Sequence, residues 1–188
     1  MRYHNITKDD MLNGDGLRVV LWLSGCSHCC KGCHNPITWD PNGGIPFDEN
    51  AKKELFEQLE KEYISGITFS GGDPLHVANR RDVTALAKEI REKYPDKTIW
   101  LYTGSLWEEV CHEEVFRYTD VCVDGEFVLE EKDTLLMWKG SRNQRVIDVQ
   151  ASLHQGAGAA PVLHCGNYSP FGNQAYEEGK DKKGYLDT

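Results

Sequence analysis

The stretch Arg18-Val-Val-Leu-Trp-Leu-Ser24, followed after Gly25 by Cys26-Ser-His-Cys-Cys-Lys-Gly-Cys33, is the most informative part of the sequence. Its first half is apolar, rich in β-branched and aromatic residues, and ends at a polar residue and a glycine, which is typical of a buried β-strand. Its second half holds four of the seven cysteines of the chain. A buried strand that runs into a cysteine-rich loop therefore links the fold to a candidate site.

The clustered cysteines favour a metal centre, because a metal stabilises crowded thiolates that would otherwise repel one another and oxidise. Read as two adjoining Cys-x2-Cys pairs, the run would bring four sulfurs poorly onto one tetrahedral zinc ion. Read as Cys26-x3-Cys30-x2-Cys33, it offers three thiolates to a cubane cluster, leaves the fourth iron open and leaves Cys29 unused. We favour the second interpretation over zinc, over a metal-free cysteine cluster and over a Cys30–Cys33 disulfide.

Composition sets the class of protein. The chain has 188 residues, of which 39% are hydrophobic and 27% charged, as expected for one globular domain. No apolar run approaches the ~20 residues of a membrane span, and the N-terminus lacks a signal-peptide core. Seven cysteines do not form a paired disulfide framework, which indicates a reducing compartment. We therefore expect a cytoplasmic protein with no membrane partner.

The charge of the chain disfavours nucleic acid. The net charge is −9, and no basic stripe interrupts the acidic surface. Because a phosphate backbone is bound by clustered Lys and Arg, nucleic acid is not an expected partner.

Strand and helix patterns alternate along the chain and predict an α/β fold with a parallel sheet. Helices are expected after an N-cap at Asp48, over residues 83–94, and after an N-cap at Ser105 with Leu106, Val110 and Val115 facing inward. The expected strands are residues 17–24, 66–70, 97–103, 120–123 and, less clearly marked, 145–149.

Four unusual loops follow the first four predicted strands. They are the cysteine run, residues 70–74, residues 102–104 and residues 124–127. Since ligands bind at the carboxyl edge of parallel strands, the four loops predict one active site at that edge.

The loop Gly71-Gly72-Asp73-Pro74 has two interpretations. Its glycines would let a ligand lie directly on the backbone, Pro74 would stiffen the turn, and Asp73 could face a cationic group. Alternatively, the loop is a tight turn capped by Asp73. Asp124 likewise fits either a hydrogen bond to a ribose hydroxyl or stabilisation of the turn at Gly125.

Other features leave their roles open. Arg18 could bind a carboxylate or form an ion pair, and the polar stretch 141–145 could line the site or be solvated. Cys111 and Cys122 fit small core residues. From Gly156 the composition becomes rich in glycine and then in charge, which predicts a domain over residues 1–155 and an extension over 156–188. His164 and Cys165 in this extension could touch a metal or be incidental.

At this point a family resemblance is clear. Cys26-x3-Cys30-x2-Cys33 together with Gly71-Gly72-Asp73-Pro74 resembles the radical S-adenosylmethionine enzymes. Gly32 stands where an aromatic residue is common, and Asp73 where glutamate is more frequent. His34 is a candidate for adenine stacking. Over residues 1–153 the chain is similar, more narrowly, to the glycyl-radical activases of anaerobic ribonucleoside-triphosphate reductase, through residues 13–18, 24–26, 32–36, 38–39, 124–127 and 143–147.

The resemblance implies a partial parallel (βα) barrel of about five to six strands. It implies a [4Fe-4S] cluster on Cys26, Cys30 and Cys33, whose fourth iron is chelated by the amino and carboxylate groups of S-adenosylmethionine. The backbone of residues 71–74 would hydrogen-bond the methionine amine. The remaining cofactor contacts implied in this way are Gly32, His34, Tyr102 and Asp124.

The resemblance also implies the reaction. One electron from a flavodoxin- or ferredoxin-type donor would cleave the sulfonium to methionine and a 5′-deoxyadenosyl radical, which would remove a hydrogen atom from a glycine of the partner reductase. No side chain need act as an acid or base, because the cofactor supplies the chemistry. Two alternatives stay open: a radical enzyme acting on a small nucleobase-like molecule, and a non-catalytic zinc-binding interaction module.

Overall fold

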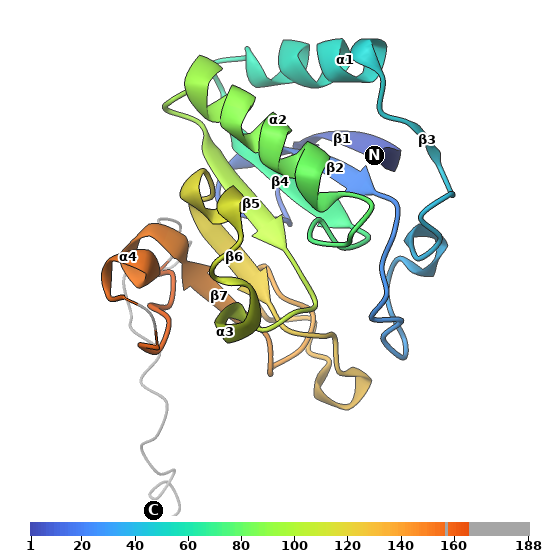
Figure 1. Ribbon diagram of the computed structural model, residues 1–188. Coiled ribbons are helices and arrows are strands. Elements are labelled where there is room, and N and C mark those ends of the chain that lie inside the picture. Colours follow the sequence, from blue (N-terminus) through green and yellow to red (C-terminus); the bar gives the residue numbers. More distant parts are fainter. Residues whose placement is uncertain (157, 166–188) are drawn as a thin grey trace, which may run out of the picture.

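A single seven-stranded sheet organises the computed structural model, which describes residues 1–156 and 158–165 (Figure 1). The order across the sheet is β3-β1-β2-β4-β5-β6-β7. Strands β2, β4, β5 and β6 are parallel to one another, whereas β1, β3 and β7 pair antiparallel with their neighbours. The strands are β1 (Arg2–Asp10), β2 (Leu17–Leu23), β3 (Ile45–Pro46), β4 (Ile64–Gly71), β5 (Thr98–Tyr102), β6 (Val121–Asp124) and β7 (Arg145–Asp148).

Helices α1 (Glu49–Leu59) and α2 (Arg80–Lys93) cover one face of this sheet (Figure 1). Alternate residues of the central strands point toward them, so that Leu21, Phe69 and Leu101 are fully buried in one apolar core with Leu55 of α1 and Ile90 of α2. The shorter helices are α3 (Trp107–Val110), α4 (Val149–His154) and the 3-10 turns Pro36–Thr38, Glu114–Arg117 and Leu129–Glu131.

The opposite face of the sheet carries a smaller core around Trp100, with Val121, Val123 and the partly buried Trp138. Arg18 is fully buried on this face, and its guanidinium lies 5.3 Å from the Trp100 ring centre. It donates hydrogen bonds to the hydroxyls of Thr68 and Thr98 and to three backbone carbonyls. Burial lowers the pKa of Arg18 to about 10. The role of Arg18, left open by the sequence, is therefore structural: its side chain stabilises the sheet.

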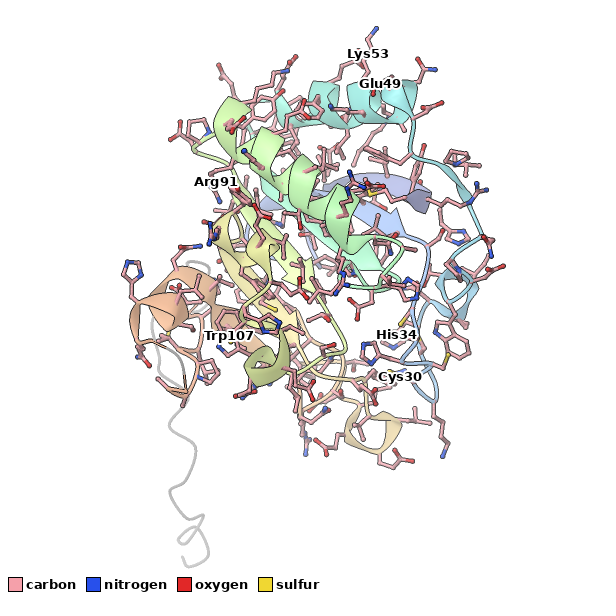
Figure 2. All side chains as sticks on the ribbon, in the orientation of Figure 1. Cys30, His34, Glu49, Lys53, Arg91 and Trp107 are labelled. Atoms are coloured by element: carbon pink, nitrogen blue, oxygen red, sulfur yellow. The ribbon has the colours of Figure 1, made fainter. Side chains whose placement is uncertain are left out.

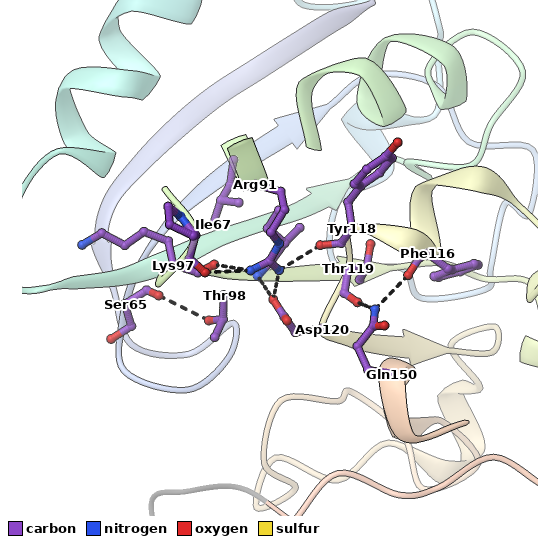
Figure 3. A network of polar contacts seen from close by, with 12 residues as sticks. Ser65, Ile67, Arg91, Lys97, Thr98, Phe116, Tyr118, Thr119, Asp120 and Gln150 are labelled. Carbon is purple, nitrogen blue, oxygen red and sulfur yellow. Dashed lines mark hydrogen bonds and ion pairs between the residues drawn. The ribbon is translucent and has the colours of Figure 1, made fainter. Parts of the chain in front are cut away.

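A polar network ties α2 and α4 to the amino ends of β5 and β6 (Figure 3). Arg91 of α2 donates to the carbonyls of Lys97 and Tyr118 and to the carboxylate of Asp120. Gln150 donates from α4 to the carbonyls of Phe116 and Thr119. The end of the sheet remote from the cysteine loop is therefore held by charged and amide side chains.

The α/β class is confirmed, and all five predicted strands are present. The expected count of five to six strands is wrong, since the described residues form seven. β1 was missed because it buries only Tyr3 and Ile6 and is otherwise polar, and β3 because it has two residues. β7 runs antiparallel rather than continuing the parallel series.

Two helix starts show how local and distant caps differ. Asp48 caps α1 as predicted, because its carboxylate accepts a hydrogen bond from the Ala51 N–H at 2.9 Å. The prediction that Ser105 caps the third helix is wrong: α3 begins after Leu106, whose side chain is exposed rather than inward. The Trp107 N–H is bound instead by Asp124 from β6, at 2.8 Å.

Part of the predicted extension adds to the sheet. The Asp148 N–H donates to the Val162 carbonyl and the His164 N–H to the Val146 carbonyl, so residues 162–164 follow the free edge of β7. The His164 ring lies 3.0 Å from the Asp15 carboxylate and edge-on to Trp100. His164 therefore has a packing role. The rest of the extension, 166–188, lies outside the described residues. The domain boundary at 155 stays a prediction.

No helix among the described residues is both long enough and apolar enough to cross a membrane.

We expect Gly66→Ala to destabilise the protein by about 3 kcal/mol, because an added methyl overpacks the contact between β4 and β5. A Cβ at this position would lie 1.9 Å from the backbone oxygen of Thr98. Urea unfolding of the apoprotein measures the loss. The matched control, Ser65→Ala on the same strand, is expected to change stability by about 0.5 kcal/mol or less. Equal losses in the two variants would contradict this account of β4.

Candidate functional site

Four loops meet at the carboxyl edge of the parallel strands, as the strand order predicted. They follow β2, β4, β5 and β6 and surround a cavity of about 120 Å³. Cys26 and Cys30 lie on one side of this cavity, residues 71–73 on another, and Tyr102 and Phe127 on the rest of its wall. A cavity of about 510 Å³ lies at the other end of the sheet, beside Asp15 and His164. We place the site at the smaller cavity because the cysteines are there.

The backbone of the cysteine run separates three cysteines from the fourth. Cys26, Cys30 and Cys33 are half-buried, whereas Cys29 is exposed and adopts a positive φ of 50°. Gly32 has a φ of 74°, and a Cβ there would lie 2.9 Å from the Leu129 side chain. Glycine therefore permits the tight turn that carries the chain from Cys30 to Cys33.

A backbone N–H group points at the sulfur of Cys33. The Asn35 N–H lies 3.4 Å from Sγ of Cys33. Burial raises the pKa of the Cys26 and Cys30 thiols, and backbone N–H groups, of His28 at Cys26 and of Phe127 at Cys30, act in the opposite direction. Such N–H···S contacts are the surroundings that iron–sulfur ligands have in proteins.

The three cysteines suit a cluster in their number and sequence separation, x3 and x2. Among the described residues, no three His, Cys, Asp or Glu side chains converge on one ion position. A cubane needs no such convergence, because each thiolate binds a different iron. Three thiolate donors on one short loop are the ligand type that iron–sulfur clusters take.

The loop of residues 71–74 packs directly on the end of β2. A Cβ at Gly71 would lie 2.8 Å from the Leu23 nitrogen, and one at Gly72 would lie 2.5 Å from the Gly25 oxygen. The N–H groups of Gly72 and Asp73 donate to the carbonyls of Leu23 and Gly25, each at 2.8 Å. Recognition of an amine by this loop thus falls to its carbonyl oxygens.

Asp73 is the polar centre of the site. Its side chain is buried, and Oδ2 accepts hydrogen bonds from the Thr103 hydroxyl at 3.0 Å and the Gly104 N–H at 3.3 Å. Oδ1 accepts from the Leu75 N–H at 2.8 Å. The same carboxylate therefore caps its own turn, as one interpretation expected, and joins the loops after β4 and β5.

The cationic group facing Asp73 is His28, which sequence reasoning missed. Its Nε2 lies 2.8 Å from Asp73 Oδ2. The hydrogen bond to Asp73, with a smaller contribution from Glu126, raises the pKa of His28 to about 9, so the ring is an imidazolium at neutral pH. Its place within the cysteine run was the available signal.

Asn79 is a second residue that the sequence did not reveal. It is almost fully buried, and its amide donates to the carbonyl of Ser24 at 2.8 Å and to that of Asp73 at 3.0 Å. It thereby joins the start of the cysteine loop to residues 71–74.

Asp124 has a structural role at the end of β6. Its carboxylate is fully buried, accepts from Nε of Arg145 at 3.1 Å, and caps α3 at Trp107. Arg145 also binds both carboxylate oxygens of Glu108. Both carboxylate oxygens of Asp124 thus bind α3 and β7 rather than the turn at Gly125, and its contact with a ribose hydroxyl stays a prediction.

Of the other predicted cofactor contacts, Tyr102 belongs to the cavity lining, whereas Gly32 and His34 do not. Tyr102 lines it and donates its hydroxyl to the Trp138 carbonyl at 2.6 Å, and burial raises the pKa of this hydroxyl. His34 is exposed, with its ring 5.2 Å from that of Phe127. Figure 2 shows His34 at the same end of the sheet as Cys30. The structure thus gathers both residues near the cysteines.

The polar stretch before β7 supports the loop after β6. Asn143 donates to the Glu126 carbonyl at 2.8 Å, and Gln144 donates to the Gly125 carbonyl at 2.9 Å. Gln144 also lines the cavity. This stretch therefore belongs to the site rather than to a solvated loop.

Comparison with known proteins identifies the family. Residues 12–147 match the model of a 4Fe-4S single cluster domain. The chain is 43% identical over 148 residues to the anaerobic ribonucleoside-triphosphate reductase-activating protein of Enterobacteria phage T4, covering 78% of this chain and 93% of that protein. The chain belongs to this family of activating proteins. The activating protein of Escherichia coli K12 is 41% identical over 150 residues, covering 78% of this chain and 97% of that protein.

A third member of the family, from Haemophilus influenzae, is 37% identical over 148 residues, or 77% of this chain and 96% of that protein. Membership in the activating-protein family confirms the resemblance drawn from the motifs. The 4Fe-4S domain match likewise favours the iron–sulfur interpretation of the cysteine run over the zinc module.

We expect Asp73→Ala to destabilise the apoprotein by about 2–3 kcal/mol, because it leaves buried donors of two loops without their acceptor. Urea unfolding at neutral pH measures the change. The matched control is Asp40→Ala, which removes an exposed carboxylate that accepts only from the Asn42 N–H in its own turn, with an expected loss of about 0.5 kcal/mol. An Asp73 variant as stable as the Asp40 variant would show that the carboxylate does not hold the loops.

Proposed function

We propose that the chain binds a [4Fe-4S] cluster and uses S-adenosylmethionine to generate a glycyl radical on an anaerobic ribonucleoside-triphosphate reductase. The observation that carries the proposal is the set of three half-buried cysteines beside residues 71–74 in a member of the activating-protein family. The cluster ligands in this proposal are Cys26, Cys30 and Cys33.

We further infer that the sheet is the partial barrel of a radical S-adenosylmethionine enzyme. Four parallel strands with helical connections, and α1 and α2 together on one face, support this architecture. In such folds the loops at the carboxyl edge hold the ligand. The proposal places the cofactor on the cavity that these loops enclose.

The chain's own residues would bind and orient the cofactor. Carbonyl oxygens of Gly71 and Gly72 would accept hydrogen bonds from the methionine amine, on a turn that Pro74 stiffens and Asp73 caps. Tyr102 would close one wall. On the adenosine side of the site we propose two contacts. One is Gly32, where the chain approaches without a side chain, and the other is His34.

When bound, the cluster and cofactor would supply one-electron radical chemistry, with the electron coming from a reduced flavodoxin- or ferredoxin-type donor and the hydrogen atom from a glycine Cα of the reductase. No side chain of this chain has to gain or lose a proton in that balance. The protein's contribution is position and the exclusion of water.

We place this activity in the cytoplasm. All seven cysteines are free thiols in the structure, and free thiols persist in a reducing compartment.

The first test is an EPR spectrum of the anaerobically reconstituted and reduced protein, with and without S-adenosylmethionine. We expect a [4Fe-4S]⁺ signal that changes when the cofactor is added, because the cofactor chelates the open iron. Mixing with the reductase should then produce a glycyl radical that requires S-adenosylmethionine. Zinc in place of iron would overturn the cluster, and turnover of a nucleobase-like compound without a glycyl radical would overturn the protein substrate.

Single cysteine variants test the ligand set. Cys30→Ala is expected to lose most of its iron after reconstitution, because a cubane requires each of its thiolates. Cys29→Ala is expected to keep the iron content and EPR signal of the parent, because Cys29 faces solvent. Cys165→Ala, an exposed cysteine remote from the run, is the control. Equal loss of iron from the Cys29 and Cys30 variants would contradict the assignment.

A further inference from the structure

His28 lies inside the cysteine run, and its imidazole is bound at both ring nitrogens. Nε2 lies 2.8 Å from Oδ2 of Asp73 in the loop after β4, and Nδ1 lies 2.8 Å from Oε1 of Glu126 in the loop after β6. These partners are 45 and 98 residues away in the sequence. The side chain is only 18% exposed, so these contacts are made largely away from water, where hydrogen bonds to charged groups are strong.

The ring also fits closely against the loop after β5. A Cβ at Gly104 would lie 2.5 Å from Cδ2 of His28, so only glycine leaves room for the imidazole. Asp73 is itself held by the Thr103 hydroxyl and the Gly104 N–H. A single side chain therefore joins the cysteine loop to the three other loops of the site.

The remaining polar side-chain contacts of residues 27–32 are weaker anchors. Lys31 pairs with Glu130 at 3.2 Å, but the two side chains are 79% and 68% exposed, and exposed pairs contribute little. The Cys29 sulfur reaches only the Cys26 carbonyl within the run itself. Among the described residues, and leaving the ligand cysteines aside, His28 thus provides the part-buried polar side-chain contact between this segment and the rest of the site.

We propose that His28 is a positioning residue that sets the distance between the cluster on the cysteines and the S-adenosylmethionine on residues 71–74. The proposal rests on the proposed function. A cofactor that chelates the open iron and also lies on the 71–74 backbone binds at two places, so the distance between those two places must match the cofactor. Displacing the cysteine loop relative to Asp73 therefore weakens cofactor binding even when the cluster is intact.

The decisive variant is His28→Phe, which keeps a ring against Gly104 and removes both hydrogen bonds. The reconstituted and reduced full-length protein is titrated with S-adenosylmethionine, and the change in its EPR spectrum gives an apparent Kd. We expect the iron content and the spectrum without cofactor to equal those of the parent. The apparent Kd is expected to rise about tenfold, as for the loss of other groups that orient metal ligands.

A second variant removes only the outer contact. Glu126→Ala truncates a carboxylate whose side chain is 57% exposed, so the fold should be retained, and the apparent Kd is expected to rise by about two- to threefold. The control is His112→Phe, at an exposed histidine far along the chain from the cysteine run, which should leave the Kd and the spectrum unchanged.

The outcomes separate the two proposals. If the parent responds to S-adenosylmethionine and the His28→Phe variant has the same Kd, the positioning role is overturned and the proposed function is unaffected. Loss of iron from His28→Phe also overturns it, because His28 would then be needed to assemble the cluster. If His28→Phe does not fold, an unchanged Kd in Glu126→Ala is the contradicting result. A parent with a cluster but no response to the cofactor removes the proposed function and this inference together.

Discussion

The parallel pairing of β2, β4, β5 and β6 is the constraint on which the rest of the structure depends. Parallel strands deliver their carboxyl ends to the same edge, so four loops that are far apart in the sequence must meet there. The register aligns Leu23 with Gly71 at the ends of β2 and β4, which brings the cysteine loop and residues 71–74 to the same level. Antiparallel β7 presents its amino end at this edge instead, and for that reason the segment before it, with Asn143 and Gln144, supports the site.

Glycines set how closely the loops approach, and carboxylates then fix them. Gly72 lets its loop touch the Gly25 carbonyl, and Gly104 makes room for His28. A buried carboxylate is costly unless it is paired and hydrogen-bonded. Asp73 and Asp124 meet this requirement with His28 and Arg145, so each acidic group ties two or more segments together. These two buried carboxylates are thus each paired with a basic side chain.

The features that the sequence predicted depend on residues close together in the chain, whereas most of the missed features depend on contacts between residues far apart in it. The central strands, the cysteine loop and the cap of α1 at Asp48 follow from patterns within a few residues, and the structure contains them. The cap of α3 could not be found in this way, because Asp124 reaches it from β6, 17 residues later. The partners of His28 lie still further away. β1 was missed for a different reason: a strand with one polar face near the edge of a sheet lacks the apolar run that marks the central strands.

The two ends of the sheet are stabilised by different means, and the difference bears on where chemistry can occur. At the amino ends of the parallel strands, Arg18 and Arg91 bind backbone carbonyls and hydroxyls in dense networks. At the carboxyl ends, the loops pack closely through glycines around a cavity. On the proposed function, the site would admit a cofactor and a protein loop, which long side chains filling it would prevent. Its geometry therefore depends on buried polar contacts such as those of Asp73, which connect the loops after β2, β4 and β5.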